Sequence, residues 1–272
     1  MLRKRFVRRG LILFFALHFM LMLSSCGSQK INRLNEAIDN QNYEEFQKYL
    51  DESLDLEEQP FPDFYYAMSE LHYQTPLQRA CRVGNYQMVK DLVDAGANVN
   101  YTDDVAPYSP LMYAVMSSSQ ENFEIVKFLV EKGASVTYRE EEYGDDALWK
   151  IILDDSTPNM EQMIDFLVEN GADIYYKDNL NSTLLHHAAG KGNTRAIRFL
   201  LQNYNFDINA TDGNNDSVLI WYCRSVLHLP NEETVSYFLE QGADPTIVNN
   251  DGKTAYDYAV ERGFVEIAEL LK

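Results

Sequence analysis

Basic residues are scarce in this sequence, and their scarcity argues against one class of partner. The 272 residues include 23 lysines and arginines against 42 aspartates and glutamates, which gives a net charge of −19. Five of the basic residues lie within residues 1–25, where there is no acid. From Cys26 onward, 18 basic residues therefore face 42 acidic ones, a net charge of −24. This negative field repels phosphate backbones, so we expect no nucleic acid partner, and it favours association with a basic protein.

Cysteines are few as well, and they form no metal-binding pattern with the histidines. The three cysteines are Cys26, Cys81 and Cys223. The adjacent residues His186 and His187 cannot face one ion together, because neighbours on a helix point about 100° apart. The sequence therefore predicts no metal site.

The sequence also lacks the short motifs of common enzyme classes. Gly190-Lys191-Gly192 has neither the upstream glycine nor the Lys-Ser/Thr ending of a phosphate-binding loop. No serine lies in a Gly-x-Ser-x-Gly pattern, and acid pairs such as Asp145-Asp146 fall in predicted loops. We therefore expect no catalytic residue and no cofactor.

Long apolar runs are absent apart from one near the N-terminus. The run from Leu11 to Leu23 has 13 residues and follows a basic segment. This length suits a signal peptide and is short of the roughly 20 residues that span a bilayer. The run ends in Leu23-Ser24-Ser25-Cys26, which resembles the signal of bacterial lipoproteins. The resemblance implies cleavage before Cys26, lipidation of Cys26 and a position in the cell envelope, at the outer membrane and facing the periplasm. An ordinary secretory signal is the alternative.

The sequence does contain a repeated pattern with a period of about 37 residues. Seven units open with a residue type that caps helix N-termini, at Asn32, Thr75, Ser109, Asp146, Thr183, Ser217 and Thr254. After each opener comes a short helix with small or apolar residues on one face, and then a second helix with an apolar stripe. A glycine follows four of the second helices, at Gly96, Gly133, Gly171 and Gly242, and glycine commonly ends helices. In the fifth unit Asn205, which also tolerates the left-handed conformation, takes that place.

The units resemble ankyrin repeats. The start of that motif is carried by Thr75-Pro76-Leu77, by Ser109-Pro110-Leu111 and by Thr183-Leu184-Leu185-His186, and its end by Gly-Ala pairs such as Gly96-Ala97. The resemblance implies an all-α solenoid of about seven helix-turn-helix units with β-hairpin-like loops. In three units the loop between the two helices is longer than usual, at residues 117–122, 154–159 and 226–231.

We accordingly divide the chain into a lipoprotein signal peptide at residues 1–25, a short tether at 26–30 and an ankyrin-repeat domain at 31–272. The resemblance gives His186 a role in stabilising the frame of its unit. Cys81 and Cys223 lie at equivalent positions four units apart, too far for a disulfide, so we expect two buried free thiols.

The resemblance also implies a binding surface, because ankyrin solenoids bind partners through a concave face of loops and first helices. In this sequence the corresponding positions assign partner contact to Tyr108, Tyr113, Glu142, Tyr143, Asp145, His187, Lys191, Trp221 and Arg224. Tyrosine and tryptophan on a rigid surface are typical of residues that dominate binding energy.

These observations predict a non-enzymatic protein-binding module, lipid-anchored at the bacterial cell envelope. The sharper hypothesis is an immunity protein that neutralises a toxin acting in the periplasm. A structural or scaffolding envelope lipoprotein is the alternative. An enzyme or a small-molecule binder is the third interpretation, and it would require a closed pocket with convergent polar groups.

Overall fold

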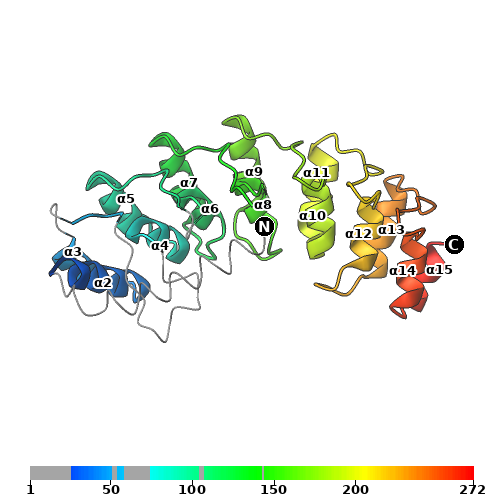
Figure 1. The fold of residues 1–272 in the computed structure, drawn as a ribbon, viewed down its shortest axis with the longest axis horizontal. Coiled ribbons are helices and arrows are strands. Elements are labelled where there is room, and N and C mark those ends of the chain that lie inside the picture. The colour runs from blue at the N-terminus through cyan, green and yellow to red at the C-terminus, as the bar shows by residue number, and fades with distance from the viewer. Residues whose placement is uncertain (1–25, 51–53, 58–73, 104–106, 143) are drawn as a thin grey trace, which may run out of the picture.

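The structure is a computed structural model that describes residues 26–50, 54–57, 74–103, 107–142 and 144–272. In these residues the chain forms fourteen helices and no strand, with one isolated bridge between Thr211 and Ser217. Figure 1 shows the helices following one another in a single curved row, from α2 and α3 at one end to α14 and α15 at the other. The predicted all-α repeat array is confirmed, and tight hydrogen-bonded turns stand where β-hairpin-like loops were expected.

The helices form seven consecutive pairs, one pair for each unit. They are α2 (Cys26–Asp39) with α3 (Tyr43–Tyr49), α4 (Pro76–Val83) with α5 (Tyr86–Asp94), α6 (Pro110–Val115) with α7 (Asn122–Glu131), α8 (Ala147–Ile151) with α9 (Met160–Glu169), α10 (Leu184–Lys191) with α11 (Thr194–Asn203), α12 (Val218–Arg224) with α13 (Glu232–Glu240), and α14 (Ala255–Glu261) with α15 (Val265–Leu270). The first helices of neighbouring units generally contact one another more extensively than the second helices do. The row therefore curves toward the first helices, which we call the inner helices (Figure 1).

Most of the inner helices start where the repeat pattern predicts. Six of the seven predicted openers are N-caps, and the side-chain oxygen of each accepts a hydrogen bond from the backbone N–H three residues on. Thr75, Thr183 and Thr254 add the reciprocal bond of a capping box. The prediction is wrong for Asn32, which lies inside α2 because this helix already begins at Cys26. Residues 26–30, which we interpreted as a tether, thus belong to α2.

Glycines end the second helices of four units. Gly96, Gly133, Gly171 and Gly242 have φ values between 89° and 99°, in the left-handed region that favours glycine. The expectation for Asn205 is wrong, because it is not among the residues with positive φ. Helix α11 instead ends at Tyr204 in an extended conformation, so the turn needs no left-handed residue.

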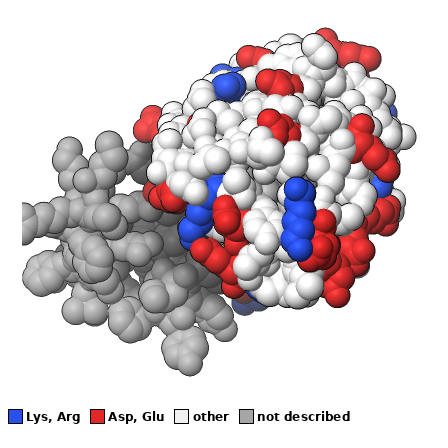
Figure 2. All heavy atoms as spheres, turned by 90° about the vertical axis from the view of Figure 1, so that its right-hand side faces the viewer, with Lys and Arg blue, Asp and Glu red and all other residues white. Residues whose placement is uncertain are grey.

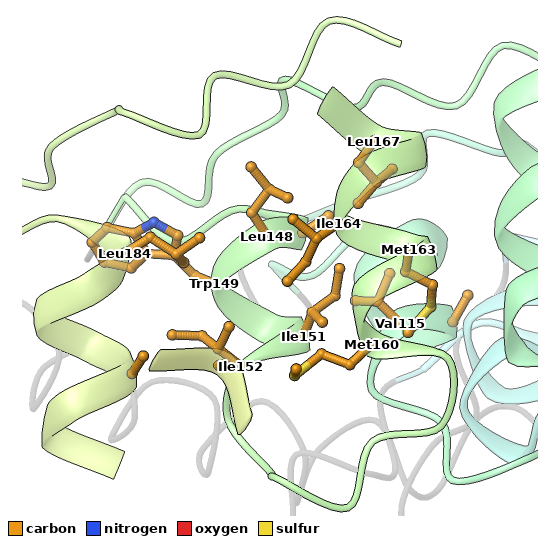
Figure 3. Close-up of a cluster of buried hydrophobic side chains, with 14 of the residues drawn as sticks. Val115, Leu148, Trp149, Ile151, Ile152, Met160, Met163, Ile164, Leu167 and Leu184 are labelled. Atoms are coloured by element: carbon orange, nitrogen blue, oxygen red, sulfur yellow. The ribbon is translucent and has the colours of Figure 1, made fainter. Parts of the chain in front are cut away.

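The hydrophobic core runs through the whole array, between the two helices of each unit and between neighbouring units. Figure 3 shows this core at α8, where Trp149 points toward Leu184 of the next unit and Ile151 lies near Met160. Cys81 and Cys223 are buried free thiols, as predicted, and burial raises the pKa of both, that of Cys223 to about 12. Both thiols are therefore protonated and unreactive at neutral pH.

Candidate functional site

Six of the inner helices, α4, α6, α8, α10, α12 and α14, carry one side chain that we compare across the units, four residues after the N-cap. These side chains are Arg79, Tyr113, Lys150, His187, Trp221 and Tyr258. The first three are buried, whereas His187, Trp221 and Tyr258 are partly exposed. Exposed rings on the inner helices are therefore concentrated in the C-terminal half, and we call His187, Trp221 and Tyr258 the ring strip.

Each ring of the strip is held by an acidic or amide side chain five residues before the N-cap of its helix. Asp178 Oδ2 lies 3.3 Å from His187 Nε2, and Asp212 Oδ2 accepts a hydrogen bond of 2.9 Å from Trp221 Nε1. In the last unit Asn249 Nδ2 donates to the Tyr258 hydroxyl at 3.1 Å. Asp178, Asp212 and Asn249 are the residues that we call the loop anchors.

The loop anchors also close the turns in which they lie. Asp178 Oδ1 accepts hydrogen bonds from the backbone N–H groups of Leu180 and Ser182, at 2.8 and 2.7 Å. The Oδ1 atoms of Asp212 and Asn249 accept the equivalent pairs in their own turns. We did not predict these three residues, although an Asp or Asn five residues before the opener in three successive units is a visible signal.

His187 lies between two tryptophans. Its ring centroid is 4.0 Å from that of Trp149 and 5.1 Å from that of Trp221, and its side chain is 22% exposed. Burial lowers the pKa of His187 below its ordinary value, and the neighbouring Asp178 carboxylate opposes that effect only in part. The ring is therefore neutral at neutral pH and donates its Nε2–H to Asp178.

Arg224 and Lys191 place positive charge at the edge of the ring strip. The Arg224 guanidinium lies 5.1 Å from the centroid of the Trp221 ring. Its Nη1 is 2.9 Å from Oδ2 of Asp216, a carboxylate that is fully buried behind it. Lys191, at the end of α10, makes no ion pair with any residue that the structure describes, and it remains available to a partner.

A hollow of about 500 Å³ lies beside Trp221. Its lining includes Lys191 from α10, Trp221 and Arg224 from α12, and Val226 and Leu227 from the loop after α12. The hollow is open to solvent along one side, so it is a groove and not an enclosed chamber. An open groove of this kind suits a protruding segment of a protein better than a small molecule that must be surrounded.

The predicted contact residues of the N-terminal half are less accessible. Tyr113 is 6% exposed and packs against Tyr108, with ring centroids 5.9 Å apart, so in the free protein it offers a partner little surface. Lys150 Nζ lies 2.5 Å from Asp145 Oδ2 and 4.0 Å from the centroid of the Tyr108 ring. Tyr108 and Asp145 thus both contact Lys150 within the chain. Both side chains are partly exposed.

Three of the predicted site residues remain: Glu142, Tyr143 and Cys26. Glu142 is exposed in the loop before α8, and its backbone N–H donates to Glu140 Oε2 at 2.9 Å. Tyr143 lies outside the described residues. Cys26 is the first residue of α2, and its side chain is likewise outside the described part.

The described residues were compared with the requirements of a metal site and of a membrane-spanning helix. They contain no group of three or more histidine, cysteine, aspartate or glutamate side chains that could hold a metal ion. Among the helices of this part of the chain, none combines the length and the apolar character needed to cross a membrane.

Two curated proteins share sequence with the array. Alpha-latrotoxin-Lg1a from Latrodectus geometricus is 29% identical over 205 residues, which cover 74% of this chain and 14% of that protein. The putative ankyrin repeat protein L92 from Acanthamoeba polyphaga mimivirus is 38% identical over 65 residues, 24% of this chain and 15% of that protein. The chain thus matches only a small part of the length of either relative.

One solved structure matches over nearly all of a relative's chain. It is the complex of the Bd0816 predatory endopeptidase from Bdellovibrio bacteriovorus with immunity protein Bd3460. The similarity has a TM-score of 0.58 at 25% identity, and it covers 72% of this chain and 95% of the matched chain.

The family itself is identified by the sequence model described as "Ankyrin repeats (3 copies)", which matches residues 34–140 and 156–249. Together these segments make up well over half of the chain. The repeats of this family are protein-binding modules, and proteins built from them are usually not enzymes. The chain therefore belongs to the ankyrin-repeat family.

Proposed function

We propose that this protein is an immunity protein of the bacterial cell envelope, which neutralises a periplasm-acting toxin by binding it through the concave face. The observation that carries the proposal is the similarity to the complex of an endopeptidase with its immunity protein, which extends over 95% of the matched chain. The ring strip supports it, because partly exposed, positioned rings are typical of binding hot spots.

A toxin neutralisation assay tests this function. The full chain and a candidate toxin, the product of a neighbouring gene, would be produced together in a bacterial host whose growth the exported toxin arrests. We expect the chain to restore growth and the variant His187→Ala to restore it less. Lys90→Ala on the outer helix α5 is the matched control and should behave as the unchanged chain. If the chain restores growth against no neighbouring toxin and retains no single protein from envelope extract, the proposal is wrong.

The position in the cell is the second part of the proposal, and it depends on Cys26. Lipids attached to this cysteine would anchor the chain firmly, because stable attachment needs more than one acyl chain. Cys26→Ser should move the chain from the membrane fraction to the soluble periplasmic fraction without changing its affinity for the partner. A wild-type N-terminus without lipid, measured by mass spectrometry, would contradict this part alone.

A further inference from the structure

The loop between α12 and α13 exposes three large aliphatic side chains to solvent. Val226 is 87% exposed, Leu227 66% and Leu229 77%. These three residues, which we call the apolar lip, belong to one of the three lengthened loops in the repeats. Clustered exposed aliphatic side chains on a soluble surface indicate a contact that the isolated chain does not satisfy.

The apolar lip is fixed in position by hydrogen bonds to the units on both sides. Toward α10, Ser225 Oγ donates to Gly190 O at 2.5 Å and His228 Nε2 donates to Ala189 O at 3.1 Å. Toward α14, Arg262 Nη2 donates to His228 O in the loop at 3.5 Å, and Arg262 Nη1 donates to Cys223 O at the end of α12 at 2.8 Å. A loop held in this way is ordered before binding, so a partner that meets it loses less conformational entropy.

The lip adjoins the hollow beside Trp221, and a glycine makes that arrangement possible. A Cβ at position 190 would stand 2.8 Å from Trp221 Cε3, so a side chain here would displace the indole. Val226 and Leu227 belong to both the lip and the lining of the hollow. Lip and hollow thus form one continuous apolar surface.

The charge at this surface is opposite in sign to that of the molecule. Lys191 and Arg224 line the hollow in a chain whose net charge is −19. Arg224 uses Nη1 to bind the buried Asp216, and within the described residues its Nη2 and Nε have no hydrogen-bond acceptor, so they remain as donors. Two cations beside an apolar groove are complementary to a carboxylate that arrives with an apolar side chain.

We propose that the apolar lip and the hollow form a docking site for a protein segment that carries a large apolar side chain next to an acidic residue. The apolar side chain would enter the hollow between Trp221 and Leu227. The carboxylate would be bound by Lys191 and Arg224. This proposal names the contact chemistry of the partner and rests on the proposed function only for the partner being a toxin.

Selection of peptides from a random twelve-residue display library, against the full chain in a non-ionic detergent, tests the docking site. We expect the selected peptides to share an apolar residue next to an aspartate or glutamate. The double variant Leu227→Ser/Leu229→Ser should weaken binding of a selected peptide by about ten-fold, and Lys191→Glu by about five-fold. Replacing the peptide's acid by its amide should weaken binding to the unchanged chain and not to Lys191→Glu.

Two matched variants separate the docking site from general effects. Val260→Ser/Val265→Ser removes two other exposed aliphatic side chains from the C-terminal unit, and Lys90→Glu reverses a charge on an outer helix. Both should bind the peptide within about two-fold of the unchanged chain. Circular dichroism and the urea midpoint of each variant show that the array is folded.

Four results would overturn the docking site: selected peptides without an acid, peptide binding that is insensitive to the lip variant, a lip that serves another occupant, or toxin neutralisation that the lip variant leaves unchanged. Self-association of the chain in sedimentation, lost in Leu227→Ser/Leu229→Ser, would show that the occupant is a second copy. If the unchanged chain adsorbs to phosphatidylethanolamine–phosphatidylglycerol vesicles more strongly than the lip variant does, the occupant is lipid. If the chain neutralises a toxin and the lip variant does so equally well, the docking site fails while the proposed function stands. If peptides bind as expected and no toxin is neutralised, the docking site stands while the proposed function fails.

Discussion

At the scale of single residues, the ring strip depends on buried groups that no partner would touch. Asp212, for example, accepts two backbone N–H groups through Oδ1 and the indole N–H of Trp221 through Oδ2. One carboxylate therefore fixes both a turn and a ring. Because the ring is already oriented, little side-chain entropy is lost when a partner packs on it.

The adjacent histidines His186 and His187 should separate stability from binding. His186 is fully buried, and its Nδ1 lies 3.2 Å from the backbone nitrogen of Thr183 and 2.8 Å from the Thr183 hydroxyl. Its removal would break the capping box and leave a cavity, so His186→Ala should lower the free energy of unfolding by about 2 kcal/mol. His187→Ala should lower it less and weaken partner binding instead. Urea unfolding and binding titrations of both variants check this, and the reverse assignment would mean that the register of this unit is wrong.

His186 should also make stability depend on pH. Burial lowers the pKa of His186 to about 4, although Asp212 opposes this, whereas the pKa in the unfolded chain is about 6.5. The folded state therefore keeps the ring neutral, and its contribution is fully present above pH 6.5 and is lost as the pH falls toward 4. The loss from this one group is on the order of 3 kcal/mol.

Asp146 acts in the opposite direction, because burial raises the pKa of this N-cap carboxyl to about 6. Protonation of Asp146 in the folded state adds stability as the pH falls below 6. This gain offsets part of the stability that His186 loses over the same pH range. We therefore expect urea unfolding at pH 7.5 and pH 4.5 to show a smaller difference for His186→Asn than for the unchanged chain. Equal differences would show that His186 is not the group responsible.

At the scale of the helices, the fourth unit departs most from the others. Helix α8 has five residues; it carries Trp149 and Ile151 and is followed by Ile152, and all three are buried. It contacts α10 less extensively than α10 contacts α12. The family model leaves out residues 141–155, which include this helix. Bulky side chains thus fill a junction in which the backbones of neighbouring inner helices are less closely packed.

This junction should open before the rest of the array. A short helix with few neighbouring backbone contacts has a low local stability. Amide hydrogen exchange should therefore be faster in α8 than in α10 and α12 by about ten-fold or more. Mass spectrometry of exchanged peptides provides the measurement. Equal protection of α8 and α12 would show that the buried Trp149 compensates for the sparse backbone packing.

The helix starts were predictable from the sequence, because a cap depends on residues three positions apart. Thr75, Ser109 and Thr183 are recognised by a local pattern that tertiary structure does not alter. Asn32 misled the prediction, because a good capping residue can also lie within a longer helix. The boundary of the first helix therefore depended on residues that do not repeat.

The surface was less predictable than the helices, because exposure depends on neighbouring units. Tyr113 and Trp221 share one repeat position, yet the first is buried against Tyr108 and the second is partly exposed. The apolar residues of the loop at 226–231 were visible in the sequence, but their orientation was not. It follows from contacts such as the bond of Ser225 to Gly190, 35 positions away in the chain.

At the scale of the whole molecule, the charge is dispersed and acidic. Figure 2 faces the C-terminal end of the array and shows acidic side chains spread over the surface, with most of the basic ones beside them. Several cations are neutralised in ion pairs, such as Arg195 with Glu161 and Arg198 with Glu233. The field at a distance is therefore negative, whereas the docking site is locally positive.

The long-range negative field and the local positive charge of the docking site should affect different rate constants of partner binding. The long-range field sets the association rate, so association with a basic partner should slow by about ten-fold between about 20 and 200 mM salt. Lys191→Glu changes the net charge of −19 by only two units but removes a short-range contact, so it should accelerate dissociation more than it alters association. Surface plasmon resonance at several salt concentrations measures both constants. An association rate that rises with salt would mean that the partner is acidic overall. The negative field would then repel the partner, and the contacts at the docking site would have to overcome that repulsion.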